Sequence, residues 1–175
     1  MRVTLIAAQS LDGFITKHDI PGAGFASAAD KEYFRTALRE FDCSVMGGVT
    51  YRGSRSALRA WRDTSRLQIV MTRAPAAFDG DATPGALEFA DRAPAQILAS
   101  LRERGRRKCA LLGGAQIHSA FLAARLVDEL WLTVEPLLFG GGTPLLAQRA
   151  DTRLSLQACE QLAPDTLLLK YHLLR

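Results

Sequence analysis

Two stretches of the chain share one pattern: residues 43–50 read CSVMGGVT and residues 109–116 read CALLGGAQ. In each, a short apolar run ends in two glycines and leads into a segment with helical spacing. Short apolar runs bounded by turn residues are typical of strands buried on both faces of a sheet. Paired glycines before a helix let backbone N–H groups approach a phosphate closely. The repeated pattern predicts an α/β fold with a phosphate-bearing ligand at its strand ends.

The rest of the chain alternates in the same way. Further strands are predicted at 3–8, 67–71, 87–89 and 129–135, and helices at 27–40, 50–60, 95–104 and 117–124. Residues 76–85 are a turn-rich connection, and two β-like segments, near 154–158 and 166–174, close the chain with no helix between them. Such alternation predicts one α/β domain over residues 1–175, with a mostly parallel central sheet, helices on both faces and antiparallel C-terminal edge strands.

Composition excludes several classes of protein. The 175 residues are 48% hydrophobic and 23% charged, which is ordinary for a globular domain and excludes disorder and a coiled coil. The net charge is +4, and arginine supplies 18 of the 22 basic residues. Two interpretations of the arginine excess stay open: a compositional bias, or a ligand that carries phosphate. A charge of +4 does not require a nucleic-acid partner.

Cysteines, histidines and apolar runs indicate the compartment. The three cysteines (43, 109 and 159) are far apart in sequence, and the three histidines (18, 118 and 172) form no metal-ligand spacing. The apolar run at 3–8 is short for a signal peptide, and no run approaches the ~18 residues of a membrane span. The sequence therefore predicts a cytoplasmic protein with no metal and no membrane contact.

Five segments carry a resemblance to a known family. They are 10–15 (SLDGFI), 42–50 (DCSVMGGVT), 70–73 (VMTR), 112–115 (LGGA) and 126–142 (LVDELWLTVEPLLFGGG). Together they resemble the reductase domain of the bacterial riboflavin-biosynthesis deaminase-reductase and, more broadly, the dihydrofolate-reductase-like superfamily. The resemblance runs from about residue 3 to residue 174, and the zinc-binding deaminase half has no counterpart here.

The resemblance implies an NADPH-dependent reductase and assigns roles to its matching residues. Thr72 and Arg73 match the place where the family binds the adenosine 2′-phosphate, a dianion that suits a guanidinium. The other cofactor-binding positions that it implies follow the remaining strands: Gly47, Gly48, Thr50, Gly113, Gly114, Ala115, Gln116, Gly140, Gly141, Gly142 and Thr143.

Three residues are candidates for the substrate side of the site. Asp12 is either a turn residue before Gly13 or a carboxylate that faces the substrate, with Ser10 nearby. Asp30 lies where a helix is expected to begin, so it either stabilises the helix dipole or binds substrate. Residues 29–34 resemble the helix that carries the substrate-binding acid of true dihydrofolate reductases, and Ser27 with Asp30 resembles a capping box.

Two departures from the family pattern leave the substrate open. Leu112 stands where riboflavin-pathway reductases typically have Glu, and Gly48 stands where dihydrofolate reductases typically have Arg, a role that Arg52 or Arg55 could take over. We therefore expect hydride transfer to a ribosylaminopyrimidine, with dihydrofolate, a pterin or another small heterocycle as the alternative. A homodimer is expected, with residues 130–132 and the terminal strands at its interface.

Two non-catalytic alternatives remain. One is a cofactor-binding protein whose catalytic role has lapsed or changed. The other is a nucleic-acid-binding module, which would use two clusters of basic residues: Arg52, Arg55, Arg59, Arg62 and Arg66 in the first, and Arg102, Arg104, Arg106, Arg107 and Lys108 in the second. Apart from Trp61 in the first cluster, neither cluster contains an aromatic residue, so the aromatic-basic interleaving typical of a stacking platform is absent.

Overall fold

The computed structural model describes residues 1–60 and 65–174 and contains one eight-stranded sheet in the order β4-β3-β2-β5-β1-β6-β8-β7. The strands are β1 (Arg2–Ser10), β2 (Cys43–Gly47), β3 (Leu67–Met71), β4 (Leu87–Ala90), β5 (Lys108–Gly113), β6 (Glu129–Glu135), β7 (Arg153–Ala163) and β8 (Thr166–Leu174). The helices are α1 (Ala28–Ala37), α2 (Gly48–Ala60), α3 (Pro94–Glu103) and α4 (Ala115–Ala123), with 3₁₀ turns at Leu38–Glu40 and Pro75–Phe78.

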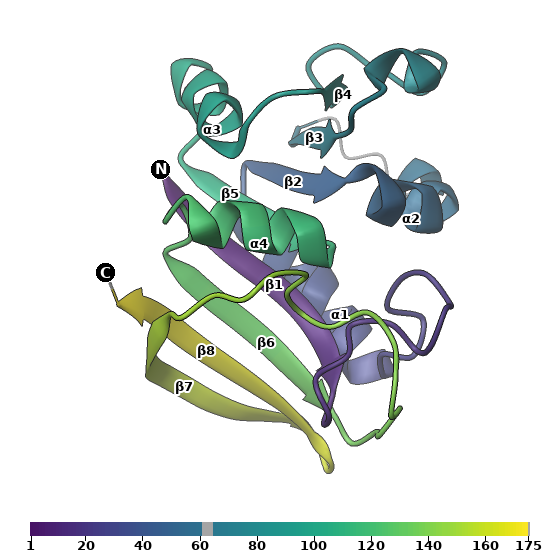
Figure 1. Cartoon of the computed structure of the whole chain (residues 1–175), viewed down its shortest axis with the longest axis vertical. Coiled ribbons are helices and arrows are strands. Elements are labelled where there is room, and N and C mark those ends of the chain that lie inside the picture. The colour runs from purple at the N-terminus through teal and green to yellow at the C-terminus, as the bar shows by residue number, and fades with distance from the viewer. Residues whose placement is uncertain (61–64, 175) are drawn as a thin grey trace.

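The sheet topology confirms the expected fold class. Strands β4, β3, β2, β5, β1 and β6 pair in parallel, whereas β8 pairs antiparallel with β6 and with β7. Because the first six strands run the same way, their carboxyl ends meet at one edge of the sheet (Figure 1). In open α/β sheets this edge is where ligands bind.

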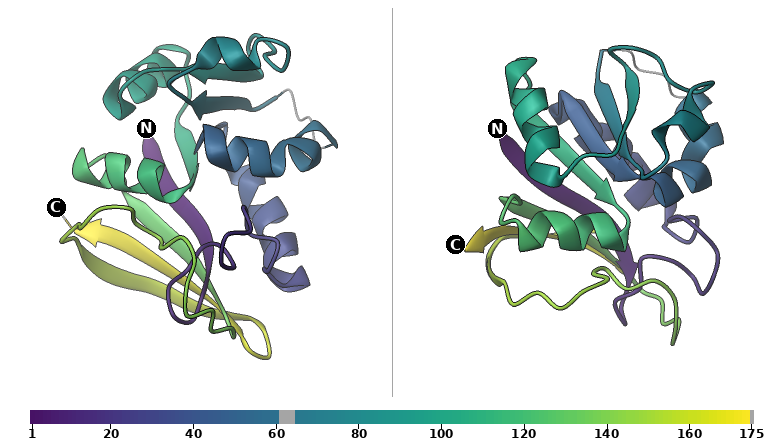
Figure 2. Two further views of the ribbon diagram at one scale, coloured as in Figure 1. Left: turned by 45° about the vertical axis from the view of Figure 1, so that its right-hand side comes forward. Right: turned by 45° about the horizontal axis from the view of Figure 1, so that its top comes forward.

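Helices cover both faces of the sheet, as Figure 2 shows from two sides. One face carries the main core, in which Leu98 of α3 and Phe121 of α4 pack on Val45, Leu5 and Leu111. The opposite face carries two smaller clusters. Phe34 of α1 packs in one of them and Tyr51 of α2 in the other, and Leu112 of β5 contacts both.

Several boundaries differ from the sequence expectation. Helix α2 begins at Gly48 rather than residue 50, so its first N–H groups belong to the glycine pair itself. Strand β7 is 11 residues long and not five, because bulges between Leu156 and Ala158 and between Gln161 and Ala163 interrupt its two-residue periodicity. A 3₁₀ turn at Pro75–Phe78 overlaps the start of the turn-rich connection expected at 76–85.

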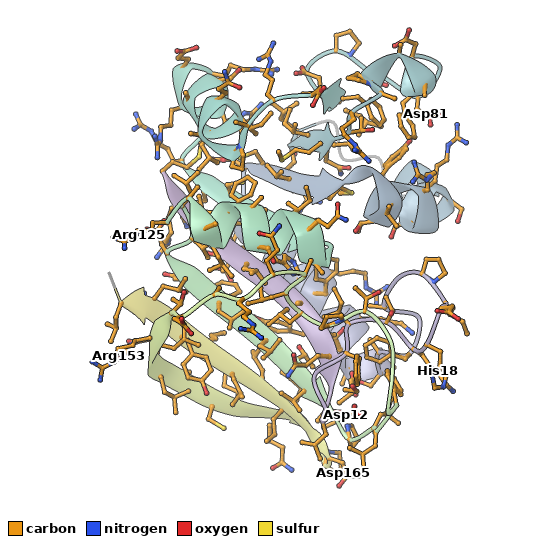
Figure 3. The ribbon with its side chains drawn as sticks, in the orientation of Figure 1. Asp12, His18, Asp81, Arg125, Arg153 and Asp165 are labelled. Atoms are coloured by element: carbon orange, nitrogen blue, oxygen red, sulfur yellow. The ribbon has the colours of Figure 1, made fainter. Side chains whose placement is uncertain are left out.

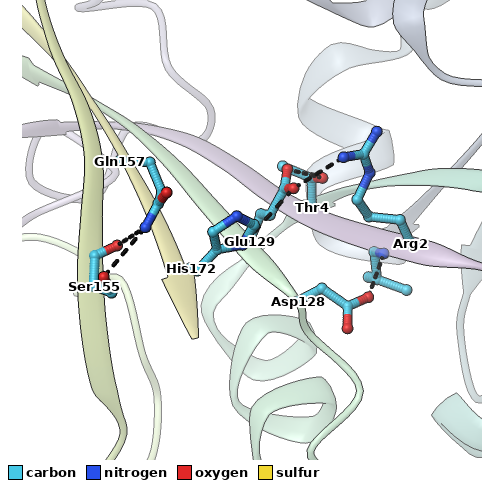
Figure 4. A network of polar contacts seen from close by, with 8 residues as sticks. Arg2, Thr4, Asp128, Glu129, Ser155, Gln157 and His172 are labelled. Atoms are coloured by element: carbon cyan, nitrogen blue, oxygen red, sulfur yellow. Dashed lines mark hydrogen bonds and ion pairs between the residues drawn. The ribbon is translucent and has the colours of Figure 1, made fainter. Parts of the chain in front are cut away.

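Polar contacts tie the amino ends of β1 and β6 together (Figure 4). The Glu129 carboxylate accepts hydrogen bonds from Arg2 Nη1 and Thr4 Oγ1, each at 3.2 Å, and Asp128 Oδ2 accepts from the Val3 amide at 2.9 Å. These contacts fix the amino ends of the two strands relative to each other. Within the part of the chain described, no helix is long and apolar enough to cross a membrane.

Candidate active site

Three strand-end turns contact one another at the carboxyl edge of the sheet. A Cβ built on Gly47 would lie 2.9 Å from Ile117 Cγ1 of α4, and one built on Gly114 would lie 3.3 Å from Thr50 Oγ1 of α2. A Cβ on Gly48 would lie 3.4 Å from the Thr72 side chain that follows β3. The structure thus brings the predicted segments 47–50, 72–73 and 113–116 together.

The first turns of α2 and α4 open onto this junction. Helix α2 begins at Gly48, and Gly114 is the N-cap of α4 with no side chain to satisfy its amide groups. Unsatisfied N–H groups and the helix dipole make a helix start favourable for a phosphate. Of the two residues that follow Gly114, Ala115 is buried and Gln116 is exposed.

Arg73 is available to an anion. Its side chain is exposed, and among the described residues no carboxylate lies within ion-pair distance of it. The substitutes proposed for the missing family arginine have other partners, because Arg55 pairs with buried Asp81 at 2.6 Å and the Arg52 guanidinium lies 5.9 Å from the Phe78 ring centroid. The exposed guanidinium and the two helix starts fit the phosphates of a dinucleotide.

The glycine-rich loop 139–144 is held by residues 12–18. Asp12 Oδ2 accepts from the amides of Phe139 and Gly140 at 3.0 and 2.7 Å, and Thr143 N donates to Thr16 Oγ1 at 2.8 Å. Gly142 has a φ of +144°, and a Cβ there would overlap the Thr16 carbonyl oxygen. The structure therefore brings Gly140, Gly141, Gly142 and Thr143 against the first turn of the chain, not against Gly47 or Gly113.

Asp12 and Ser10 hydrogen-bond with each other and with backbone amides of two loops. Asp12 is exposed at the carboxyl edge (Figure 3), and the Ser10 hydroxyl donates to its Oδ1 at 2.5 Å. This hydrogen bond is the largest of the effects that lower the pKa of Asp12, together with the Phe139 and Gly140 amides. The Ser10 hydroxyl also accepts from the Phe14 amide at 3.0 Å. Their contacts fasten two loops, and a role in substrate binding stays a prediction.

Asp30 is a buried acid at the start of α1. Its side chain is 8% exposed and hydrogen-bonds with Thr133 of β6. Burial raises the pKa of Asp30, the Thr133 hydrogen bond opposes that shift, and the charge of Glu135 adds to it. Among the three predicted substrate-side residues, Asp30 alone has the environment typical of a functional acid.

Sequence reasoning missed Glu135. Ser27 caps α1 as expected, since its hydroxyl accepts from the Asp30 amide at 3.1 Å. The reciprocal half of the expected capping box is wrong, because the Ser27 amide donates to Glu135 Oε1 at 2.8 Å and not to Asp30. Alternation along β6 places Glu135 on the same face of the sheet as Trp131 and Thr133. A glutamate on this covered face is the feature of the sequence that could have indicated a functional residue.

The carboxyl half of β1 is incompletely covered. Residues 3–6 are buried, whereas Ala7, Ala8 and Gln9 are half-buried although β1 lies between β5 and β6. Leu112, at the end of β5, is half-buried as well and contacts the clusters under both α1 and α2. The carboxyl half of this central strand is therefore more accessible than its amino half.

Several arginines of the proposed nucleic-acid surface have structural partners. Arg66 Nη1 donates to the Leu38 carbonyl at 2.6 Å, Arg106 Nη1 donates to the Asp42 carbonyl at 3.2 Å, and Arg104 pairs with Glu88 at 2.8 Å. The side chains of Arg59 and Arg62 lie outside the described residues.

Two residues of the expected dimer interface are buried within the protomer. Leu130 and Leu132 are 8% and 7% exposed and belong to the main core of the protomer. Trp131 packs edge-on against Phe41, with their ring centroids 5.5 Å apart. The exposed apolar side chains of this region are instead those of Leu154, Leu156, Leu167 and Leu174 on β7 and β8.

Known structures share this fold at low sequence identity. A Thermotoga maritima diaminohydroxyphosphoribosylaminopyrimidine deaminase/5-amino-6-(5-phosphoribosylamino)uracil reductase matches with a TM-score of 0.79 and 17% identity, over 99% of this chain and 56% of that one. An Enterococcus faecalis dihydrofolate reductase complexed with NADP(H) matches with a TM-score of 0.65 and 18% identity, over 98% and 96%.

Sequence comparison leads to one family. The riboflavin biosynthesis protein RibD of Corynebacterium ammoniagenes is 29% identical over 154 residues, which are 83% of this chain and 46% of that protein. The profile of the RibD C-terminal domain matches residues 1–168, nearly the whole chain. With the strand-end turns and the dihydrofolate-reductase-like sheet in place, the chain belongs to the RibD C-terminal domain family, a family of riboflavin-pathway reductase domains.

Proposed function

We propose that the protein is an NADPH-dependent reductase of the riboflavin-biosynthesis type, which transfers a hydride to a ribosylaminopyrimidine. The observation that carries this proposal is the junction of the 47–50, 72–73 and 113–116 turns at the same sheet edge as buried Asp30. The cofactor supplies the hydride, and the protein supplies position and electrostatics.

Different parts of the junction bind different groups of the cofactor. The helix starts at Gly48 and Gly114 bind phosphate through backbone N–H groups, and Arg73 binds the 2′-phosphate through charge-assisted hydrogen bonds. On the substrate side, Asp30 receives an N–H group of the heterocycle or holds a proton for it. Because Cys43, Cys109 and Cys159 are all free, a reducing cytoplasm suits the protein.

A second candidate is a reductase of dihydrofolate, a pterin or a related heterocycle. It is favoured by two features of the carboxyl edge: the half-buried apolar side chain of Leu112 at the end of β5, and the buried acid Asp30 at the start of α1. An apolar side chain and one carboxyl group are what a flat heterocycle requires. NADPH-oxidation assays with the ribosylaminopyrimidine and with dihydrofolate distinguish the two. Turnover of the first alone supports the riboflavin-type reaction, turnover of the second alone supports the alternative, and no turnover of either contradicts both.

Replacing Arg73 with alanine should weaken NADPH binding by about 10- to 150-fold, because charge-assisted hydrogen bonds contribute roughly 1.5–3 kcal/mol. NADH lacks the 2′-phosphate, so its affinity should change little. Titration calorimetry with both nucleotides measures the difference. Arg153→Ala, an exposed arginine at the other end of the sheet, is the control and should bind both as the wild type does. Equal NADPH affinity in Arg73→Ala and wild type would refute the assignment.

We also propose a homodimer that covers the β7–β8 face. Strand β7 is an 11-residue edge strand, and its Leu154 and Leu156 are 41% and 54% exposed. A long apolar edge strand is a template for another chain. Sedimentation should show a dimer for the wild type and a folded monomer for Leu156→Asp, whereas a wild-type monomer at micromolar concentration would contradict the proposal.

A further inference from the structure

Two carboxyl groups are buried side by side where α1 meets the end of β6. Asp30 of α1 is 8% exposed and Glu135 of β6 is 2% exposed. Within the described ranges 1–60 and 65–174, neither group forms an ion pair with a lysine, arginine or histidine. Two neighbouring carboxylates without a paired cation repel each other, so one of them is favoured to hold a proton.

The hydrogen bonds distinguish the two groups. Glu135 Oε1 accepts from the Ser27 amide at 2.8 Å, and its Oε2 accepts from the Thr166 hydroxyl at 3.1 Å. Both oxygens therefore act as acceptors, which suits an ionised carboxylate. Ser27 is the N-cap of α1, and its hydroxyl accepts from the Asp30 amide. Through Ser27 and Thr166, Glu135 therefore connects strands β6 and β8 to the first turn of α1.

The environment of Asp30, in contrast to that of Glu135, favours the protonated form. Burial raises its pKa first, and the nearby negative charge of Glu135 raises it further, while Thr133 and Lys31 act in the other direction. The other charged groups packed against α1 lie near Tyr33, one helical turn after Asp30. Lys170 of β8 pairs with Glu160 of β7 at 3.0 Å, and burial raises the pKa of Tyr33, which keeps that phenol neutral.

We propose that Glu135 is a positioning residue for Asp30: it anchors the helix turn that carries Asp30 and, as the ionised member of the pair, leaves the proton on Asp30. The role of Glu135 is thus both geometric and electrostatic. Its negative charge is needed, and not only its hydrogen bonds.

The catalytic meaning of this arrangement rests on the proposed function. A reduction by hydride also requires a proton. In the proposed reaction the hydride adds to the carbon of the opened ribosyl C=N bond, and a protonated Asp30 gives its carboxyl proton to the nitrogen of that bond. Asp30 becomes a carboxylate and regains a proton from water. Glu135 keeps its hydrogen bonds to Ser27 and Thr166 throughout and does not transfer a proton.

Glu135→Gln separates charge from geometry. A glutamine has nearly the same shape; its carbonyl oxygen can accept from the Ser27 amide, and its amide can donate to the Thr166 hydroxyl. The negative charge is lost, and the hydrogen bond with Thr166 reverses its direction. We expect the carbon-13 resonance of the Asp30 carboxyl, followed by NMR as pH varies in the ligand-free protein, to titrate at a lower pH in Glu135→Gln than in wild type.

Glu160→Gln is the matched control. It removes the same kind of charge from β7, where Glu160 is 48% exposed and pairs with Lys170, and it should leave the Asp30 titration unchanged. The proposal is overturned if the Asp30 carboxyl titrates with the same pH midpoint in Glu135→Gln as in wild type. An equal downward shift in Glu160→Gln also overturns it, because that would indicate a general effect of net charge.

Activity provides a separate readout. If protonated Asp30 is required, kcat/KM falls at high pH as Asp30 ionises, and Glu135→Gln should move this fall to lower pH. If the wild type oxidises no NADPH but the NMR shift is found, the proposed function fails while the Glu135–Asp30 coupling stands. If Glu135→Gln does not fold, the wild-type titration decides: an Asp30 carboxyl resonance that titrates in the ordinary aspartate range overturns the proposal.

Discussion

Replacing Asp30 with asparagine should lower kcat/KM by about 10²- to 10⁴-fold at neutral pH, the range expected when a positioned acid–base group is removed. Asparagine has nearly the same size and can still hydrogen-bond with Thr133, but it cannot hold or release the proton. The measurement is the steady-state rate of NADPH oxidation with the substrate identified in the assays above.

The loss should not arise from unfolding. Because the pKa of Asp30 is raised in the folded protein, the folded state holds this proton more tightly than the unfolded chain does. The wild type therefore loses stability as pH rises from the ordinary aspartate range through the raised value, and Asp30→Asn does not. At neutral pH the variant should unfold at a urea concentration equal to or above that of wild type.

Glu32→Gln is the control for the activity loss. Glu32 lies on the same helix and is 68% exposed, and among the described residues its ion-pair partner is Arg35, one turn away. This variant should keep the wild-type rate. If Asp30→Asn keeps its rate to within a few-fold, Asp30 is not a catalytic residue and serves the start of α1 alone.

Replacing Gly113 with alanine should lower the free energy of unfolding by about 2–5 kcal/mol. Gly113 has a φ of +90°, where a side chain strains the backbone by about 1–3 kcal/mol. A Cβ there would also overlap the imidazole of His118, and overpacking a buried site costs a similar amount. His118 cannot easily move, since it is 1% exposed and its Nδ1 lies 2.9 Å from the Leu145 carbonyl oxygen.

Urea unfolding measures this loss, with Gly80→Ala as the control. No atom lies within 4 Å of a Cβ at Gly80, so that substitution should change stability by less than about 1 kcal/mol. A loss in Gly113→Ala as small as in Gly80→Ala would show that the His118 ring is not fixed against this turn.

The alternation of strands and helices could be predicted from the chain because each signal is local. The apolar run before Gly47 and Gly48, and its counterpart before Gly113 and Gly114, mark buried strands that lead into helices whatever the rest of the molecule does. The length of β7 could not be predicted in this way, because its bulges depend on pairing with β8.

The candidate site likewise has features that local sequence predicts and features that depend on tertiary contacts. The chain by itself determined which residues end the strands, and therefore that glycine turns and Arg73 would gather at one edge of a parallel sheet. Only the tertiary structure decided what each polar group contacts there. Asp12 is held by the Phe139 and Gly140 amides, and Glu135 lies beside Asp30 although 105 positions separate them. Burial and charge at Asp30 arise from α1 and β6 together, and neither segment alone carries them.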